Sequence, residues 1–219
     1  MRDGRCEIWY NQSVKIIEIK TLAIPDIKVI RFGRFNDQRG YFTETFRESD
    51  FRKLDFMKDV KFVQCNDAFS NTGTFRGLHF QWNPYMGKLV RVTRGKILDL
   101  ALDIRKGSPT FGKIIAYELT SKPVDDQNEW IWLPPGFAHG VLALEESQVE
   151  YFCSGEYSPG CEASISPMAA DIDWSICDTK LKKVFDSVVP KTKLITEKDK
   201  NGFTLAAWSK EKNSDQFKY

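Results

Sequence analysis

Between residues 62 and 153 the chain is a succession of short apolar runs that end at turn signals, and this limits the possible fold more than any other feature. In one run, apolar side chains occupy every second position, at Leu98, Leu100, Leu102 and Ile104. A period of two is typical of β-strands, whose successive side chains point to opposite faces of a sheet. Turn chemistry marks the ends of such runs, as at Gly95 and at the Pro-Pro-Gly sequence of residues 134–136. Many short strands that do not alternate with helices predict a mainly β protein, built as a sandwich or a jelly roll.

Strands are also predicted before this region. Residues 16–19 are typical of an edge strand, and residues 28–32 of a second short strand. Residues 41–46 are rich in β-forming side chains and predict a third strand. In that case Arg39 would lie at the entrance to the strand, just before its first residue, and Glu44 would lie within it.

The remaining elements complete the predicted topology. Residues 141–144 and 148–153 should form a hairpin around a turn, because two strand-like runs flank a short polar segment. Apolar spacing predicts a helix within residues 48–58, an amphipathic segment at 179–188 and a short helix within 194–208. These helices would be few, short and peripheral.

One domain accounts for most of the chain. Single all-β units of about 200–250 residues are common, and 42% hydrophobic residues supply an ample core. We expect a polar N-terminal extension at residues 1–15, one domain at residues 16–210 and a tail at residues 211–219.

The net charge and the cysteines limit which binding partners and which cellular compartment are expected. A formal net charge of +2 gives no reason to expect a nucleic acid or an anionic membrane as a partner. The N-terminus lacks the apolar segment of a signal peptide, and no run of about 18 apolar residues occurs. The five cysteines are odd in number and never spaced as C-x-x-C, which argues against disulfides and zinc. We therefore predict a cytoplasmic protein.

Residues 75–94 hold the candidate chemistry, because Arg76, His79 and Lys88 lie there within an otherwise apolar strand-turn-strand pattern. The chain has two histidines, and the second, His139, follows the turn at 134–136. A lone strand histidine is usually a hydrogen-bonded core residue, but this one has basic neighbours. A neutral imidazole can accept a proton, and nearby cations can stabilise developing negative charge or bind phosphate.

A metal site is the main rival interpretation, because jelly-roll enzymes often bind a metal through histidines and a carboxylate. The sequence has no H-x-H pair, and Lys88 would place a cation near the ligands. We therefore expect no catalytic metal. The chain also lacks a glycine-rich phosphate loop, a nucleophile elbow and a dinucleotide-binding fingerprint, so no bound dinucleotide is expected.

Taken alone, Tyr151 and Asp199 have ordinary explanations. Tyr151 is typical of a core tyrosine whose hydroxyl bonds to the backbone, and Asp199 lies in a charged cluster that resembles a solvated surface.

Across residues 16–210 the sequence resembles the dTDP-4-dehydrorhamnose 3,5-epimerase family, whose members are cupin-type jelly rolls and usually homodimers. Seven motifs in order carry the resemblance: RGYFTETF at 39–46, FVQCN at 62–66, FRGLHFQ at 75–81, GKLVRVTRG at 87–95, LDLALDIRKGSPTFGK at 98–113, WLPPGFAHG at 132–140 and ITEKDK at 195–200.

The resemblance implies a role for each matched residue. His79 matches the catalytic base, Asp199 the carboxylate that orients it, Lys88 the residue that stabilises an enolate, and Tyr151 the acid on the opposite face of the sugar. Positions that bind the nucleotide diphosphate-sugar, or support that site, are matched by Arg39, Glu44, Gln64, Asn66, Arg76, His139, Glu162 and Lys198. The implied reaction inverts C3, C5 or both in a nucleotide-linked 4-keto-6-deoxyhexose, and it needs no cofactor because the ketone acidifies both positions.

The chain departs from the family pattern at three places. Glu156-Tyr157 stands where an aromatic pair is usual, Cys65 and Asp67 interrupt the usual Asp-Asn-His pattern, and the connection before Lys88 is one residue shorter. These departures leave open the nucleotide and the number of inverted centres. A single-centre epimerase, a CDP-linked dideoxy substrate, a metal-dependent cupin oxygenase and a sugar-nucleotide-binding module without chemistry remain alternatives.

Overall fold

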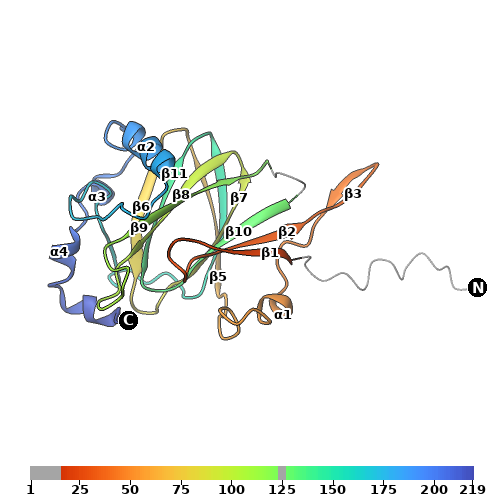
Figure 1. Ribbon diagram of the computed structural model, residues 1–219. Coiled ribbons are helices and arrows are strands. Elements are labelled where there is room, and N and C mark those ends of the chain that lie inside the picture. Colours follow the sequence, from red (N-terminus) through yellow and green to blue (C-terminus); the bar gives the residue numbers. More distant parts are fainter. Residues whose placement is uncertain (1–15, 123–126) are drawn as a thin grey trace, which may run out of the picture.

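Two antiparallel sheets facing each other form the body of the protein in the computed structural model, which describes residues 16–122 and 127–219 (Figure 1). The extension predicted at residues 1–15 lies outside the described residues. The six-stranded sheet has, in spatial order, β1 (Ile16–Thr21), β2 (Lys28–Gly33), β10 (Gln127–Leu133), β7 (Lys88–Arg94), β12 (Ser147–Cys153) and β5 (Gln64–Ser70). The five-stranded sheet has β13 (Glu162–Ser164), β6 (Phe75–Gln81), β11 (Phe137–Ala143), β8 (Lys96–Asp103) and β9 (Ile114–Thr120). The predicted mainly β sandwich and its edge strand β1 are confirmed.

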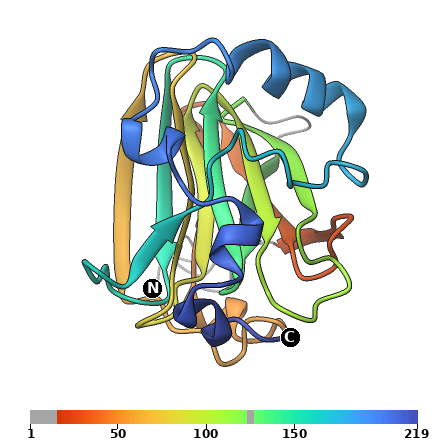
Figure 2. The ribbon, with the colours of Figure 1, turned by 90° about the vertical axis from the view of Figure 1, so that its left-hand side faces the viewer.

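The apolar side chains divide into three layers. Val90, Ala101 and Val149 belong to the cluster between the two sheets. Leu98 and Leu100 point the other way, into a cluster that the C-terminal segment covers (Figure 2). Strand β8 is therefore buried on both faces, which explains its high apolar content.

The outer face of the six-stranded sheet is covered by the segment that follows β4 (Gly40–Phe42). The prediction of a strand through residue 46 is wrong: β4 ends at Phe42, and Glu44 lies beyond it. The Trp130 indole donates a 2.6 Å hydrogen bond to the Thr45 carbonyl. This bond holds the backbone at Thr45 against the outer face of the sheet. The helix predicted within 48–58 is limited to α1 (Glu48–Phe51), followed by turns.

Several connections cross from one sheet to the other. The predicted hairpin of residues 141–144 and 148–153 is wrong, because β11 pairs with β6 and β8, whereas β12 pairs with β5 and β7. Residues 82–87 likewise lead from β6 in one sheet to β7 in the other. A period-two pattern defines a strand but not its partner, and in a jelly roll consecutive strands often belong to opposite sheets.

The C-terminal region forms short helices over the outer face of the five-stranded sheet: α2 (Thr179–Val188), α3 (Glu197–Lys200), α4 (Leu205–Trp208) and a 3-10 helix, η1 (Lys212–Gln216). The single helix predicted within 194–208 is thus two helices, because Thr196 and Thr204 each cap a new start. Phe217 is 4% exposed and belongs to the core cluster that contains Leu98 and Leu100, so the predicted tail packs against the domain.

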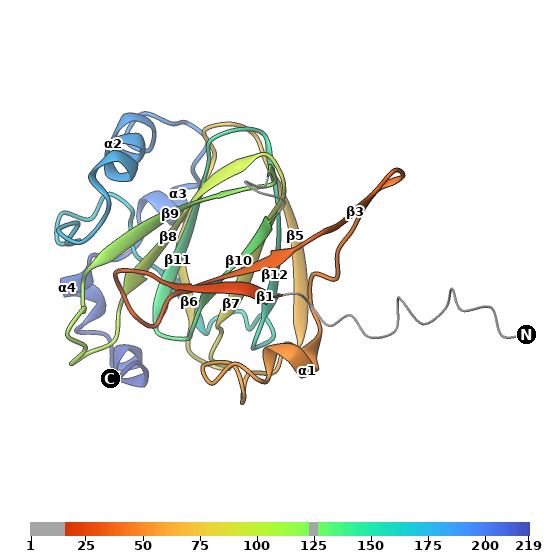
Figure 3. The ribbon, with the colours of Figure 1, turned by 45° about the vertical axis from the view of Figure 1, so that its right-hand side comes forward.

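A small hairpin of β3 (Phe35–Asp37) and β4 projects away from the sandwich (Figures 1 and 3). Its aromatic side chains Tyr41 and Phe42 are 58% and 56% exposed. Within the described residues, no helix is long and apolar enough to span a membrane.

Candidate active site

A groove opens between the two sheets on the side of β5 and β6. It consists of two adjoining cavities of about 620 and 520 Å³, which share His79, Lys88 and Tyr151 in their walls. All of the predicted site residues line one cavity or the other except Arg39 and Glu44. The groove is lined by residues from both sheets and from the segment 193–199, so it requires the complete tertiary fold.

His79 forms a close polar pair in the groove with Asp199. Its Nε2 atom lies 2.6 Å from Oδ1 of Asp199, which is 3% exposed and belongs to α3. Burial raises the pKa of Asp199, but hydrogen bonds from His79, the Gly77 amide and Thr196 outweigh it and hold the pKa below its ordinary value. When Nε2 donates its proton to this carboxylate, Nδ1 is left as the free acceptor.

Gly77 allows strand β6 to approach β11 closely beside this pair. Its φ of +128° favours glycine, and a Cβ atom there would lie 2.5 Å from Gly140 Cα. The close approach of β6 to β11 therefore needs glycine, and it leaves the Gly77 N–H 3.3 Å from Asp199 Oδ2.

His139 lies beside His79, since the two are opposite each other in the β6–β11 ladder. Its Nε2 atom is 2.8 Å from Oδ2 of Asp99, and both side chains are buried. Burial lowers the pKa of His139, and the nearby Lys88 and His79 act in the same direction against the opposing effect of Asp99. A low pKa keeps His139 neutral and able to hydrogen-bond. Asp99 was missed, although an acidic residue inside the apolar run at 96–105 was a usable signal.

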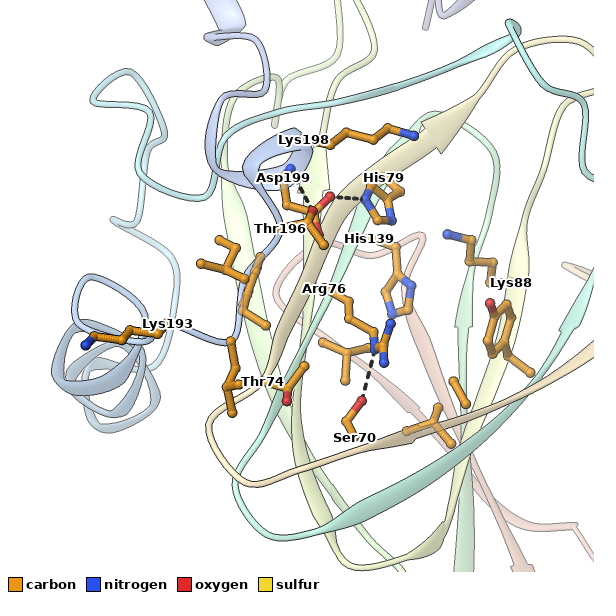
Figure 4. A pocket seen from close by; sticks show the side chains of 17 residues that line it. Ser70, Thr74, Arg76, His79, Lys88, His139, Lys193, Thr196, Lys198 and Asp199 are labelled. Atoms are coloured by element: carbon orange, nitrogen blue, oxygen red, sulfur yellow. Dashed lines mark hydrogen bonds and ion pairs between the residues drawn. The ribbon is translucent and has the colours of Figure 1, made fainter.

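Lys88 and Tyr151 come from neighbouring strands of the opposite sheet. Burial lowers the pKa of Lys88, and the charges of Cys153, Asp99 and Glu162 partly oppose this effect. Burial raises the pKa of Tyr151, which favours the protonated phenol. The groove thus places a proton acceptor on one wall and a cation with a proton donor on the other (Figure 4).

Basic and amide side chains extend the groove on either side of this centre. Arg76 donates to the Ser70 hydroxyl at 3.0 Å and to the Phe69 carbonyl at 3.1 Å, and Figure 4 shows its guanidinium beside His139. In the second cavity, Gln64 donates to Asn66 at 2.9 Å, and Asn66 donates to Cys153 Sγ at 3.7 Å. Such groups suit an anionic, polar ligand.

The mouth of the second cavity carries a three-residue cluster. Tyr157 donates its hydroxyl proton to Glu162 at 3.0 Å, and the Lys198 ammonium donates to the same oxygen at 2.6 Å. Burial raises the pKa of Glu162, but these two bonds outweigh it and hold the pKa below its ordinary value. Tyr157 is therefore a lining residue that sequence reasoning treated only as a departure from the family pattern.

Two predicted binding residues lie elsewhere in the molecule. Arg39 is at the turn of the β3–β4 hairpin, with a side chain 74% exposed and paired to Asp37 at 2.6 Å. Glu44 pairs with Arg47 at 2.8 Å. Neither lines the groove of its own chain.

In the part of the chain that the structure describes, no group of three or more His, Cys, Asp or Glu side chains is arranged to hold a metal ion.

Comparisons with known proteins agree on one family. A family model described as dTDP-4-dehydrorhamnose 3,5-epimerase matches residues 21–207. The chain is 40% identical to the dTDP-4-dehydrorhamnose 3,5-epimerase of Sinorhizobium fredii over 78% of this chain and 87% of the relative. It is 37% identical to the same enzyme of Shigella flexneri over 84% of this chain and 93% of the relative.

Solved structures give the same result. The 3,5-epimerase of Legionella pneumophila in complex with dTDP-4-keto-L-rhamnose superposes with a TM-score of 0.73 at 31% identity, covering 86% of this chain and 93% of that one. A 3'-monoepimerase from Streptomyces bikiniensis in complex with dTDP superposes with a TM-score of 0.72 at 28% identity, covering 86% and 87%.

Proposed function

The chain belongs to the dTDP-4-dehydrorhamnose 3,5-epimerase family of isomerases, and from this premise we propose that its groove inverts C3, C5 or both in dTDP-4-dehydro-6-deoxyglucose. The observation that carries the proposal is the arrangement of the His79–Asp199 pair opposite Lys88 and Tyr151 in one groove. An inversion needs a base on one face of the ring and an acid on the other, and these groups stand on opposite walls.

The base acts first. The C4 ketone acidifies the neighbouring C–H bonds, and Nδ1 of His79 removes a proton while its Nε2–H stays bonded to Asp199. The resulting imidazolium is stabilised by the Asp199 carboxylate, whose low pKa keeps it charged. A positioned base contributes roughly 10²–10⁴-fold to the rate.

The enolate is then stabilised and reprotonated. Negative charge grows on the C4 oxygen, where the Lys88 ammonium can meet it with little competition from water. Tyr151 donates a proton to the opposite face of the same carbon, which inverts it. Its phenolate is formed only transiently, because burial favours the protonated form.

The diphosphate and nucleoside would occupy the polar extensions of the groove. Arg76 offers a guanidinium whose bonds to Ser70 and Phe69 fix its orientation. Gln64, Asn66, Glu162 and Lys198 supply further donors and acceptors in the adjoining cavity and at its mouth.

Incubation with dTDP-4-dehydro-6-deoxyglucose in D₂O tests the proposal. NMR should show deuterium at C3, C5 or both and an inverted product. A folded, dTDP-binding protein that introduces no deuterium at either carbon would refute epimerisation and support a binding module.

The number of inverted centres and the nucleotide are decided by the same assay. Superposition on both a 3,5-epimerase and a 3'-monoepimerase makes a single-centre reaction the second candidate. Deuterium confined to one carbon would identify it. A CDP-linked substrate run in parallel tests the nucleotide.

Metal analysis and chelation test the oxygenase alternative, because a cofactor-free epimerase keeps full activity in a chelator.

We propose further that the protein is a homodimer in which the β3–β4 hairpin of one subunit reaches the groove of the other. This would reconcile the exposed position of Arg39 with the substrate-binding role that the resemblance implies. The exposed Tyr41 and Phe42 suit an interface.

Subunit complementation tests that arrangement. An inactive His79→Asn protein mixed with an Arg39→Ala protein should regain activity, because one groove of the heterodimer then has both residues intact. If Arg39 acts within its own chain, neither groove is intact and no activity returns. Light scattering gives the subunit number independently.

The cytoplasm remains our predicted location, and the absence of nucleic-acid and membrane partners also remains a prediction. The free thiols of Cys65, Cys153, Cys161 and Cys177 support a reducing compartment.

A further inference from the structure

The connection at residues 82–87 links the two walls of the groove. It begins directly after β6, which carries His79, and ends at Lys88 in the opposite sheet. Met86 from this connection lines the second cavity. The conformation of the connection therefore helps to set the position of Lys88, the residue that directly follows it, relative to His79.

One side of the connection is fixed by neighbouring parts of the domain. The Gln81 side chain donates to the Pro84 carbonyl at 2.8 Å, and Gly87 N–H donates to the Ser154 hydroxyl at 2.7 Å. Tyr85 lies between these two attachments and is 45% exposed.

Tyr85 is held from the other side by the C-terminal segment. Its hydroxyl lies 2.9 Å from the main-chain carbonyl of Gln216 and 3.2 Å from the Gln216 side-chain oxygen. Its ring lies 5.7 Å from the ring of Phe217, measured between centroids. Both contacts involve the segment 212–217.

That segment is itself firmly attached to the domain. Phe217 is 4% exposed, and its ring lies 5.9 Å from that of Phe80, which neighbours His79 on β6. Lys106 N–H donates to the Phe217 carbonyl at 2.8 Å, and the Lys106 ammonium pairs with Asp215 at 2.8 Å.

The family match ends at residue 207, so residues 212–217 lie outside the part of the chain that the family model matches.

We propose that residues 212–217 form a clamp on the connection at 82–87, and that Tyr85 is a positioning residue for Lys88. The inference rests on the proposed epimerase function for its catalytic consequence. Catalysis is sensitive to such positioning, since a misplacement of about 1 Å can cost on the order of 10²-fold in rate.

Three single variants distinguish an effect of the clamp on the connection from a general loss of stability. Tyr85→Phe removes the hydroxyl and keeps the ring, and Phe217→Leu keeps an apolar side chain but loses the ring contact. Tyr219→Phe is the matched control, because Tyr219 lies two residues beyond the segment, is 71% exposed and stacks on Arg105 instead of the connection. Hydrogen–deuterium exchange, kcat, KM and the dissociation constant for dTDP are measured for each.

We expect Tyr85→Phe and Phe217→Leu to speed amide exchange in 82–87 about fivefold, as loss of one net hydrogen bond would. Both should lower kcat about three- to tenfold and leave dTDP affinity unchanged, because Lys88 acts on the sugar. The double variant should be less than additive, since both changes release one clamp. Tyr219→Phe should match the wild type.

Unchanged exchange in 82–87 in Tyr85→Phe would overturn the clamp, and so would faster exchange with unchanged kcat. If Phe217→Leu fails to fold, Tyr85→Phe decides alone. If the wild type turns over none of the tested sugars, the proposed function fails. The amide exchange of residues 82–87 in the variants then supports or overturns the clamp without the kinetic data.

Discussion

His79 and Lys88 face the same groove from opposite sheets of the sandwich, although a single short connection joins their strands. The chain passes from one wall of the groove to the other between these two residues. A proton acceptor and a cation therefore stand on opposite walls, where each can act on a different part of a sugar bound between them.

His79→Asn should abolish turnover while the protein still binds dTDP. The asparagine retains a polar side chain near Asp199 but has no basic nitrogen, so kcat should fall by roughly 10²–10⁴-fold. Turnover and dTDP affinity from calorimetry check the prediction. Equal losses of affinity and turnover would indicate a binding role instead.

Tyr151→Phe should uncouple proton exchange from inversion. His79 can still form the enolate and return a proton from the same face, but the donor on the other face is missing. We expect deuterium to enter the substrate in D₂O with little inverted product, measured by NMR and chromatography on one sample. A variant that inverts at the wild-type rate would assign the acid to another group.

The activity should decline on the alkaline side with an apparent pKa below 10.5, the ordinary value for lysine. Burial lowers the pKa of Lys88, so the cation that stabilises the enolate is lost at a lower pH than in a free lysine. Tyr151, with a pKa raised above 10.0, keeps its proton over that range. The pH profile of kcat gives this limb.

Lys88→Arg provides the matched variant, because a guanidinium stays protonated and should shift the alkaline limb to higher pH at some cost in kcat. Thermal unfolding over the same pH range controls for loss of fold. An alkaline limb that does not move in Lys88→Arg would exclude Lys88 as its origin.

Asp103→Asn should destabilise the fold by about 3 kcal/mol at pH 7, the low end of the cost of breaking a buried ion pair, because Arg105 keeps a second partner in Asp26. Asp103 is fully buried and accepts bonds from Arg105, Ser108 and Thr110. Burial raises its pKa, but these bonds outweigh it and lower the pKa below 3.8.

The sign of the pH effect follows from that lowered pKa. The stabilisation is fully present above pH 3.8 and is lost as the pH falls through the lower pKa of the folded state. Urea unfolding should therefore show a difference between variant and wild type that shrinks in strong acid. Asp37→Asn, which removes an exposed pair with Arg39, should show no measurable change.

Gly77→Ala should be far more damaging than Gly107→Ala. Both glycines have a positive φ, which costs an alanine about 1–2 kcal/mol. A Cβ at residue 77 also meets the backbone of Gly140 at 2.5 Å, whereas at residue 107 nothing lies within 4 Å. Urea unfolding should show the larger loss for residue 77. Equal losses would mean that β6 can move away from β11.

The strands were predictable because their information is local. Alternation at 96–105, the turn at 134–136 and the edge strand at 16–19 each depend on side chains a few residues apart, and the structure confirms all three. The basic and imidazole groups at 76, 79 and 88 were also visible, since polar residues stand out in an apolar run. The family motifs added Asp199 and Tyr151, which spacing alone could not identify.

The errors have a common physical cause. The hairpin predicted from 141–144 and 148–153 fails because alternation shows which side chains share a face but not which strand lies alongside. The strand predicted through residue 46 fails because the backbone at Thr45 satisfies its hydrogen bonding with a tryptophan 85 residues away.

By itself, the sequence determined the β-sandwich class, the strands and most of the chemical groups of the site. The family resemblance paired His79 with Asp199, and the structure places them 2.6 Å apart. The tertiary structure alone decided that His139 meets Asp99 and that Lys88 stands on the opposite wall. Residues far apart in the chain come together when two sheets bury their apolar faces against each other, and that packing is a property of the whole chain. The groove is lined by both sheets and by the segment 193–199, and no local pattern in the sequence brings these parts together.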